Sequence, residues 1–298
     1  MHLDYLVIGH VTRDLIISSS QPPREDLSAV PSRLGGTAAY AARTARTLGC
    51  RVGVVTSAAP DLELDEGLGD VRVASLPAQA STTFLNIYED GRRQVLRSVA
   101  RPIELAAVPA DWRASLVHIG PVVRECDPSL VTSFPGAFIG VTPQGWMREW
   151  DDGGHISRCR WSSAEKILPF ADAVVLSEED IAGDRSVALD YARLTRCLVL
   201  TEGPAGCTIY LAGEAQHIPA PEVREIDPTG AGDVFAASFF HILQRTRDPR
   251  KAARFANCCA ARSVARPGLS GSPRKTEVAR CREATSGTGN DGHSLRAG

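Results

Sequence analysis

The sequence predicts an α/β protein with a central, mostly parallel β-sheet covered by helices on both faces. Short apolar runs recur along the chain, and segments with helix-like composition separate them. From residue 116 the apolar runs occupy 116–119, 137–141, 173–176 and 197–201, and the helix-like segments lie near 127–134, 162–170 and 178–193. Strands and helices that alternate at this spacing need right-handed crossovers, which make the strands parallel.

The N-terminal third adds to this pattern in chain order. Strands are expected at 3–9, 14–19 and 52–56, and an alanine-rich helix at 37–48. The helix follows a double glycine, Gly35-Gly36, and stops at Gly49. The apolar runs 83–88 and 94–97 flank Asp90-Gly91, a hairpin signal. This pair is therefore predicted to form a ribbon that protrudes from the main sheet.

The C-terminal part is predicted to be helical. Two helices are expected at 231–245 and 249–264, and a short amphipathic segment near 276–282. The tail, 286–298, is rich in Gly, Ser, Thr and Asn and has no apolar period, so we expect it to be disordered.

Composition excludes several classes of function. The 298 residues are 43% hydrophobic, enough for one large core. The net charge is −2 with mixed signs, and aromatic residues make up 6%, which argues against a nucleic-acid or membrane-surface partner. The first apolar run, Leu6-Val7-Ile8, is too short for a signal or membrane segment. A cytoplasmic protein is expected.

The eight cysteines have no metal-binding or redox spacing. No Cys-x-x-Cys pair occurs, and several cysteines lie in apolar runs, so we expect reduced, buried thiols. Five histidines (His10, His118, His155, His217 and His241) share no spacing that indicates a metal site or a catalytic triad, and we assign them to the core or surface.

The segment Asp227-Pro228-Thr229-Gly230-Ala231-Gly232-Asp233 carries the strongest functional signal. It predicts a tight turn that opens into a buried helix. Backbone N–H groups at a helix N-terminus lack partners, and the helix dipole adds positive charge there, so the turn suits a phosphate. Asp233 next to such a site indicates phosphoryl transfer, with the carboxylate as general base. The alternative is a glycine-capped helix in which Asp233 only favours the dipole.

This segment resembles the signature of the ribokinase-like, or PfkB, family of carbohydrate kinases, D-T-x-G-A-G-D. The resemblance implies that Asp233 is the catalytic base and that the amides of Gly230, Ala231 and Gly232 form an anion hole. Pro228 stands where the family varies. It also implies ATP as the phosphate donor and Mg²⁺ bridging its phosphates.

Two N-terminal motifs are similar to the family's substrate site. Asp14 follows the first strand, where the resemblance implies a carboxylate that binds substrate hydroxyls. Gly35-Gly36 matches a double glycine that lets substrate approach the backbone. The family often has a substrate-binding asparagine at the position of Tyr40, and a tyrosine there would suit a bulkier or flatter substrate. Ordinary turns and loops are the alternative for each motif.

Three later motifs are similar to the donor site. Ser177 and Asp180 replace the ends of the family's N-x-x-E pattern, which implies water-mediated Mg²⁺ binding; the alternative is an acidic first helical turn. The run from Thr201 through Gly203 to Gly206 resembles a T-x-G-x-x-G phosphate element, or else a simple hairpin turn. Asn257 is the implied adenine contact, and the alternative is an ordinary packed, alanine-rich helix.

Together the motifs imply a ribokinase-like three-layer fold with a small β lid. One kinase domain would span 1–285, with lid strands from about 10–33 and 81–99, and the exposed lid could pair between subunits as a homodimer. The segment around Gln144 and Arg148 looks like that of the myo-inositol kinase branch, which implies that both contact a ring of hydroxyls.

Other functions remain open at this point. A sugar or polyol is the expected acceptor, but a nucleoside kinase of the same family and a catalytically inactive sensor are alternatives. No Walker motif occurs, which excludes a P-loop kinase, and the turn after the first strand lacks the G-x-G-x-x-G of a Rossmann dehydrogenase.

Overall fold

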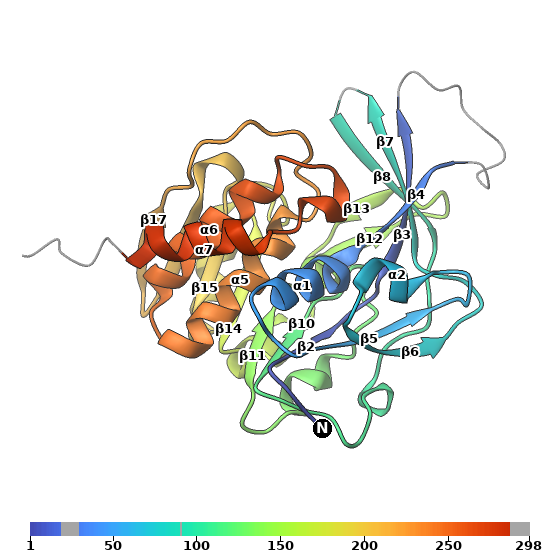
Figure 1. Ribbon diagram of the computed structural model, residues 1–298, viewed down its shortest axis with the longest axis horizontal. Helices are drawn as coiled ribbons and strands as arrows, with labels where there is room; N and C mark the ends of the chain where they lie inside the picture. Colours follow the sequence, from blue (N-terminus) through green and yellow to red (C-terminus); the bar gives the residue numbers. More distant parts are fainter. Residues whose placement is uncertain (19–29, 90, 287–298) are drawn as a thin grey trace, which may run out of the picture.

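The chain forms a three-layer α/β unit with a small sheet at one corner (Figure 1). The computed structural model describes residues 1–18, 30–89 and 91–286. Residues 287–298 of the predicted tail and Asp90 of the predicted hairpin turn lie outside the described part. Within that part, none of the helices combines the length and hydrophobicity that a membrane crossing requires.

The main sheet has nine strands in the order β17-β16-β15-β14-β11-β10-β2-β5-β6. Its strands are β2 (Tyr5–Ile8), β5 (Val52–Ala58), β6 (Arg72–Pro77), β10 (Leu116–Ile119), β11 (Phe138–Val141), β14 (Ala173–Ser177), β15 (Leu198–Thr201), β16 (Cys207–Leu211) and β17 (Glu214–Ile218). The strands from β6 to β15 pair in parallel, as predicted. The hairpin β16–β17 adds an antiparallel edge.

A second sheet of four strands forms the lid. Its order is β4-β3-β7-β8, from β3 (Thr12–Ser18), β4 (Ser32–Gly35), β7 (Thr83–Glu89) and β8 (Gly91–Ser98). The predicted hairpin is present as β7–β8, but it is half of the sheet, because β3 pairs in parallel with β7. In Figure 1 the lid stands away from the helical layers.

Alternating side chains of the strands bury two separate faces of the main sheet. Tyr5 and Val7 pack in a core with α1 (Gly36–Thr47), α5 (Ala231–Thr246) and α6 (Pro249–Ser263). Leu6 and Ile8 face the opposite core, which contains α3 (Ala164–Ile167) and α4 (Arg185–Ala192). This period of two follows from strand geometry. The helix α7 (Lys275–Ser286) lies over α6 (Figure 1).

The remaining elements are short and connect the layers. They are β1 (His2–Leu3), α2 (Leu64–Leu68), η1 (Leu105–Ala107), β9 (Arg113–Ala114), η2 (Pro128–Thr132), η3 (Gln144–Met147), β12 (Arg148–Trp150), β13 (Ile156–Arg158), η4 (Leu168–Phe170), η5 (Gly203–Ala205) and η6 (Gly268–Gly271). The helix predicted at 178–193 is shorter in the structure, where it is α4. It starts late because Ala182 and Gly183 adopt positive φ and Asp184 caps the helix that follows.

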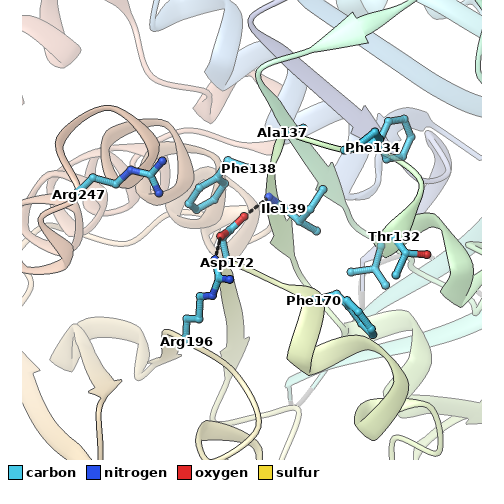
Figure 2. Close-up of a pocket in the computed structure, with 12 residues that line it drawn as sticks. Thr132, Phe134, Ala137, Phe138, Ile139, Phe170, Asp172, Arg196 and Arg247 are labelled. Atoms are coloured by element: carbon cyan, nitrogen blue, oxygen red, sulfur yellow. Dashed lines mark hydrogen bonds and ion pairs between the residues drawn. The ribbon is translucent and has the colours of Figure 1, made fainter.

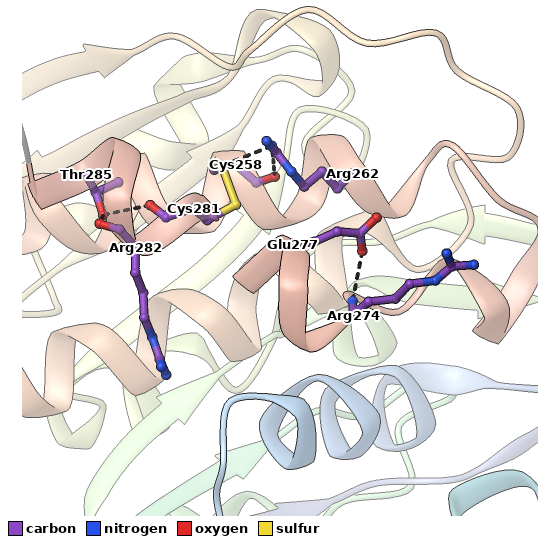
Figure 3. Close-up of a disulfide and its surroundings, with 7 residues drawn as sticks. All are labelled: Cys258, Arg262, Arg274, Glu277, Cys281, Arg282 and Thr285. Carbon is purple, nitrogen blue, oxygen red and sulfur yellow. Dashed lines mark hydrogen bonds between the residues drawn. A yellow bond between two sulfur atoms is a disulfide. The ribbon is translucent and has the colours of Figure 1, made fainter. Parts of the chain in front are cut away.

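The expectation of eight reduced cysteines is wrong for two of them. Cys258 of α6 and Cys281 of α7 form a disulfide, with their Cα atoms 5.7 Å apart (Figure 3). The packing of α7 on α6 brings the two cysteines within disulfide range. Their separation of 23 residues in the sequence matches no disulfide motif, so the sequence did not indicate this pairing. The other cysteines, Cys50, Cys126, Cys159, Cys197, Cys207 and Cys259, are free and are buried or half-buried.

Reduction should destabilise the protein. The disulfide closes a loop of 23 residues, and restricting the unfolded chain in this way is worth about 3 kcal/mol. We expect a dithiol reductant to lower the midpoint of chemical denaturation of the wild type and to leave a Cys258→Ser/Cys281→Ser double variant unchanged. Thiol titration of the unfolded, unreduced protein should find six thiols. Eight thiols, or equal sensitivity of both proteins to reductant, would contradict the disulfide.

Candidate functional site

One cavity collects most of the predicted site residues. It measures about 650 Å³ and lies where the carboxyl ends of β11, β14 and β15 meet the lid and the start of α5. The predicted residues that line it are Asp14, Gly36, Tyr40, Gln144, Arg148, Ser177, Asp180, Thr201, Gly203, Gly230, Ala231, Gly232 and Asp233. Ligands of parallel α/β sheets bind at this end of the strands.

The turn before α5 is held by Asp227. Its Oδ1 accepts a hydrogen bond from the N–H of Thr229 at 2.9 Å, and its Oδ2 accepts one from the N–H of Gly268, also at 2.9 Å. The backbone N–H of Asp227 donates to the carbonyl of Val264 just after α6. The first aspartate of the motif therefore fixes the glycine turn to the C-terminal helices.

Gly230 lets Tyr40 pack directly beneath this turn. Gly230 has φ of +80°, and a Cβ atom placed on it would overlap the ring of Tyr40. Tyr40 is 3% exposed. Tyr40 therefore lines the cavity while its ring supports the turn, and its contact with a substrate stays a prediction.

The first turn of α5 places N–H groups and a carboxylate side by side. The N–H of Ala231 donates to the carbonyl of Pro228 at 3.1 Å, so this predicted anion-hole donor is engaged within the turn in the present conformation. Gly232 and Asp233 follow in the same turn, and both line the cavity. Asp233 is partly exposed and lines the cavity, while Val234 next to it is fully buried.

Asp14 lines the cavity from the lid strand β3. It is 8% exposed, and Oδ1 accepts a hydrogen bond from the Thr12 hydroxyl at 2.9 Å. A Cβ atom on Gly35 would overlap the Asp14 carboxylate, so Gly35 lies behind Asp14 rather than on the cavity surface. Gly36, with φ of +82°, packs against the carbonyl of His10 and does line the cavity.

The lid contributes residues that the sequence did not single out. Phe84 of β7 and Gln94 of β8 line the cavity, and Gln94 donates from Nε2 to Oδ1 of Asn86 at 2.9 Å. The alternating pattern of 83–88 could have indicated two faces, but choosing the inner face requires the pairing of β7 with β3. Thr142 and Val122, from loops after main-sheet strands, were also missed.

Ser177 and Asp180 close the short loop after β14, because the side chain of each accepts a hydrogen bond from the backbone N–H of the other. The Ser177 N–H donates to Oδ2 of Asp180 at 2.8 Å, and the Asp180 N–H donates to the Ser177 hydroxyl at 3.2 Å. The Gln144 side chain donates to Oδ1 of Asp180 at 3.4 Å. These two residues therefore shape the loop after β14, which is the role of a capping pair.

The acidic residues beside this loop could bind a cation together with phosphate. Glu178, Glu179 and Asp180 line the cavity, and Glu178 pairs with Arg185 at 2.7 Å. No group of three metal-binding side chains occurs in the described residues. Mg²⁺ commonly keeps its waters and binds through one or two carboxylates and the substrate phosphates, so this donor set suits it.

Two predicted nucleotide contacts lie away from the cavity. Asn257 is 3% exposed, and its Nδ2 donates to the carbonyls of Ile218 and Pro219 at 2.9 and 3.2 Å. Gly206 has φ of +108° and packs against the carbonyl of Ile218 at the start of β16. Neither lines the cavity. Both are engaged in tertiary contacts with the end of β17, and their contacts with a nucleotide stay predictions.

A second hollow of about 530 Å³ lies at the opposite end of the sheet (Figure 2). There Asp172 pairs with Arg196 at 2.8 Å and accepts from the N–H of Ile139 at 2.9 Å. These bonds tie the amino ends of three neighbouring strands together. None of the predicted site residues lines this hollow.

Comparison with known proteins agrees with these features. Residues 160–276 match the pfkB family carbohydrate kinase profile. The fructokinase of Klebsiella pneumoniae is 27% identical over 240 residues, covering 71% of this chain and 77% of that protein. The cytidine kinase of Thermococcus kodakarensis is 28% identical over 269 residues, covering 82% of this chain and 90% of that protein.

Solved structures show the same fold. A pyrophosphate-dependent kinase of the ribokinase family, in complex with a pyrophosphate analogue and myo-inositol, superposes with a TM-score of 0.77 at 19% identity, covering 93% of this chain and 99% of that chain. The matched profile over residues 160–276, the named kinase relatives and the ribokinase-like fold agree with the glycine turn and its aspartate, and together they support a phosphotransferase similar to the PfkB carbohydrate kinases.

Proposed function

We propose that the protein transfers the γ-phosphate of ATP to a hydroxyl of a sugar or polyol, with Asp233 as the general base. The observation that carries this proposal is the shared cavity, which has the glycine turn and Asp233 on one wall and Asp14 on another. Asp14 would accept hydrogen bonds from the substrate hydroxyls next to the attacking one and so orient the substrate. The attacking hydroxyl would transfer its own proton to Asp233.

The start of α5 would stabilise the transferring phosphoryl group. The N–H groups at Gly230, Ala231 and Gly232 and the helix dipole offer positive charge where negative charge develops. For the Ala231 N–H to take part, its bond to the Pro228 carbonyl must open. Because phosphoryl transfer is mostly positioning and electrostatics, a preformed turn accounts for much of the catalysis.

The acceptor side suits a molecule with several hydroxyls. Asp14 accepts hydrogen bonds, Arg148 donates them, and Gln94 and Gln144 can do both. We propose myo-inositol as the first candidate, in line with the ligand of the similar structure. A nucleoside acceptor is favoured by Phe84, an aromatic ring on the lid side of the cavity, and by the likeness to a cytidine kinase. The intact Asp233 argues against an inactive sensor.

The donor would lie over Thr201 and Gly203. Both line the cavity, and Gly203 is exposed with φ of +56°. Mg²⁺ would be held near Glu179 and Asp180 by bridging water molecules. When bound, it would neutralise charge on the phosphates. A homodimer formed through the lid and a cytoplasmic location stay predictions.

The acceptor can be identified by measuring turnover with a panel of candidate substrates. We expect ADP release from Mg-ATP with one class among polyols, pentoses, hexoses and nucleosides, with myo-inositol the first candidate and cytidine the main alternative. Pyrophosphate is the alternative donor to test, because one similar structure is that of a pyrophosphate-dependent kinase. A panel in which no acceptor is turned over, although ATP binds, would contradict the proposed function.

Replacing the general base should remove turnover but spare binding. Asp233→Asn is expected to lower kcat about a thousandfold, since it removes proton transfer, while the affinity for ATP measured by calorimetry changes little. Asp65→Asn is the matched control, because Asp65 is an exposed carboxylate in the first turn of another helix, α2. Wild-type kcat in the Asp233 variant would refute its assignment.

A methyl group on Gly230 should misplace the turn. Gly230→Ala introduces a positive-φ alanine and a clash with Tyr40, and a displacement of about 1 Å can lower kcat about a hundredfold. Gly213→Ala is the control: Gly213 also has positive φ, at +85°, but has open space around it. Both should lose about 1 kcal/mol of stability to the positive φ, the Gly230 variant should lose more because of the clash with Tyr40, and only the Gly230 variant should lose kcat. Equal kcat in the two variants would show that the turn tolerates displacement.

A further inference from the structure

A buried chain of hydrogen bonds ends at the acceptor side of the cavity. The Tyr5 hydroxyl lies 2.9 Å from Nδ1 of His118, and Nε2 of His118 lies 2.9 Å from the Thr142 hydroxyl. Tyr5 and His118 are fully buried in the core, and the ring of Phe240 from α5 packs edge-on against His118, with centroids 5.0 Å apart. Thr142 lines the cavity and is 8% exposed.

The direction of these bonds follows from hydrogen-bond accounting. Burial lowers the pKa of His118 to about 3, so the imidazole is neutral and has one N–H and one acceptor nitrogen. Burial also raises the pKa of Tyr5, which keeps its O–H as a donor. Within the described residues, His118 Nδ1 is the acceptor that this O–H can reach. Nδ1 must therefore accept, and Nε2 carries the proton.

The opposite tautomer would leave a buried donor without a partner. If Nδ1 carried the proton, the Tyr5 oxygen would accept it and its own O–H would point into the apolar core, at a cost of about 1–3 kcal/mol. With the proton on Nε2, His118 donates to the Thr142 oxygen. The hydroxyl hydrogen of Thr142 then points away from His118. The open space beside this hydroxyl is the cavity.

We propose that Tyr5 and His118 are positioning residues that fix Thr142 as a hydrogen-bond donor to the acceptor substrate. Resting on the proposed function, this gives the acceptor site one fixed donor, Thr142, and one fixed acceptor, Asp14. Such a pair recognises a molecule whose oxygens both accept and donate, which is the property of neighbouring hydroxyls on a sugar or polyol.

The tautomer can be measured without any substrate. In protein labelled with nitrogen-15 at histidine, and with the His118 signals assigned through a His118→Gln variant, we expect the proton on Nε2. Tyr5→Phe removes the donor to Nδ1, so signals of the other tautomer should appear. A wild-type His118 with its proton on Nδ1 would overturn the inference whatever the acceptor is.

Kinetics with myo-inositol test the role of Thr142. Thr142→Val should raise KM for myo-inositol about three- to tenfold at unchanged KM for ATP, Thr142→Ser should restore it, and Tyr5→Phe should raise it as well. Thr44→Val is the control, because the buried Thr44 hydroxyl has no hydrogen-bond partner among the described residues and lies outside the cavity lining. Should myo-inositol be inert, the same variants are compared with the active panel member.

The outcomes separate this inference from the function on which it rests. Unchanged KM in Thr142→Val, with an active wild type, would overturn the donor role and leave the kinase assignment intact. A wild type that phosphorylates no member of the panel would overturn both.

Discussion

The position of α5 against the centre of the sheet is the constraint on which the site depends. The apolar run from Val234 to Phe240 is buried, and the ring of Phe240 fills the space where a side chain on Gly140 of β11 would be. Burial of this many large side chains stabilises the helix by several kcal/mol. Because the helix cannot slide, its N-terminus and Asp233 are held at the carboxyl ends of the strands.

The turn before α5 is in turn held by the last third of the chain. Asp227 bonds the N–H of Gly268, and the neighbouring Arg266 forms a two-point ion pair with Glu277 of α7, at 2.7 and 2.9 Å. Cys281, one turn further along α7, is bonded to Cys258 of α6. The C-terminal helices thus act as a clamp behind the anion turn, although none of their residues lines the cavity.

The sequence predicted well what is encoded locally. The glycine turn, the parallel strands and the β7–β8 hairpin are set by backbone preferences and apolar period, and all are present. The sequence did not reveal the tertiary partners of individual side chains, because no local pattern encodes them. Asn257 binds carbonyls at the end of β17, Tyr40 supports Gly230, and Cys258 meets Cys281. The lid residue Gln94 was missed for the same reason.

The two walls of the cavity differ in how strongly their residues are constrained. In the proposed function, the donor wall and the anion turn bind phosphate and stabilise the same transition state whatever the acceptor is, and both lie within residues 160–276, which match the pfkB profile. The acceptor wall, from Asp14 through Phe84 and Gln94 to Arg148, lies entirely before residue 160, where that match begins. Since only this wall would contact the acceptor in the proposed function, we expect the lid and the loops after β10 and β11 to determine the choice of substrate.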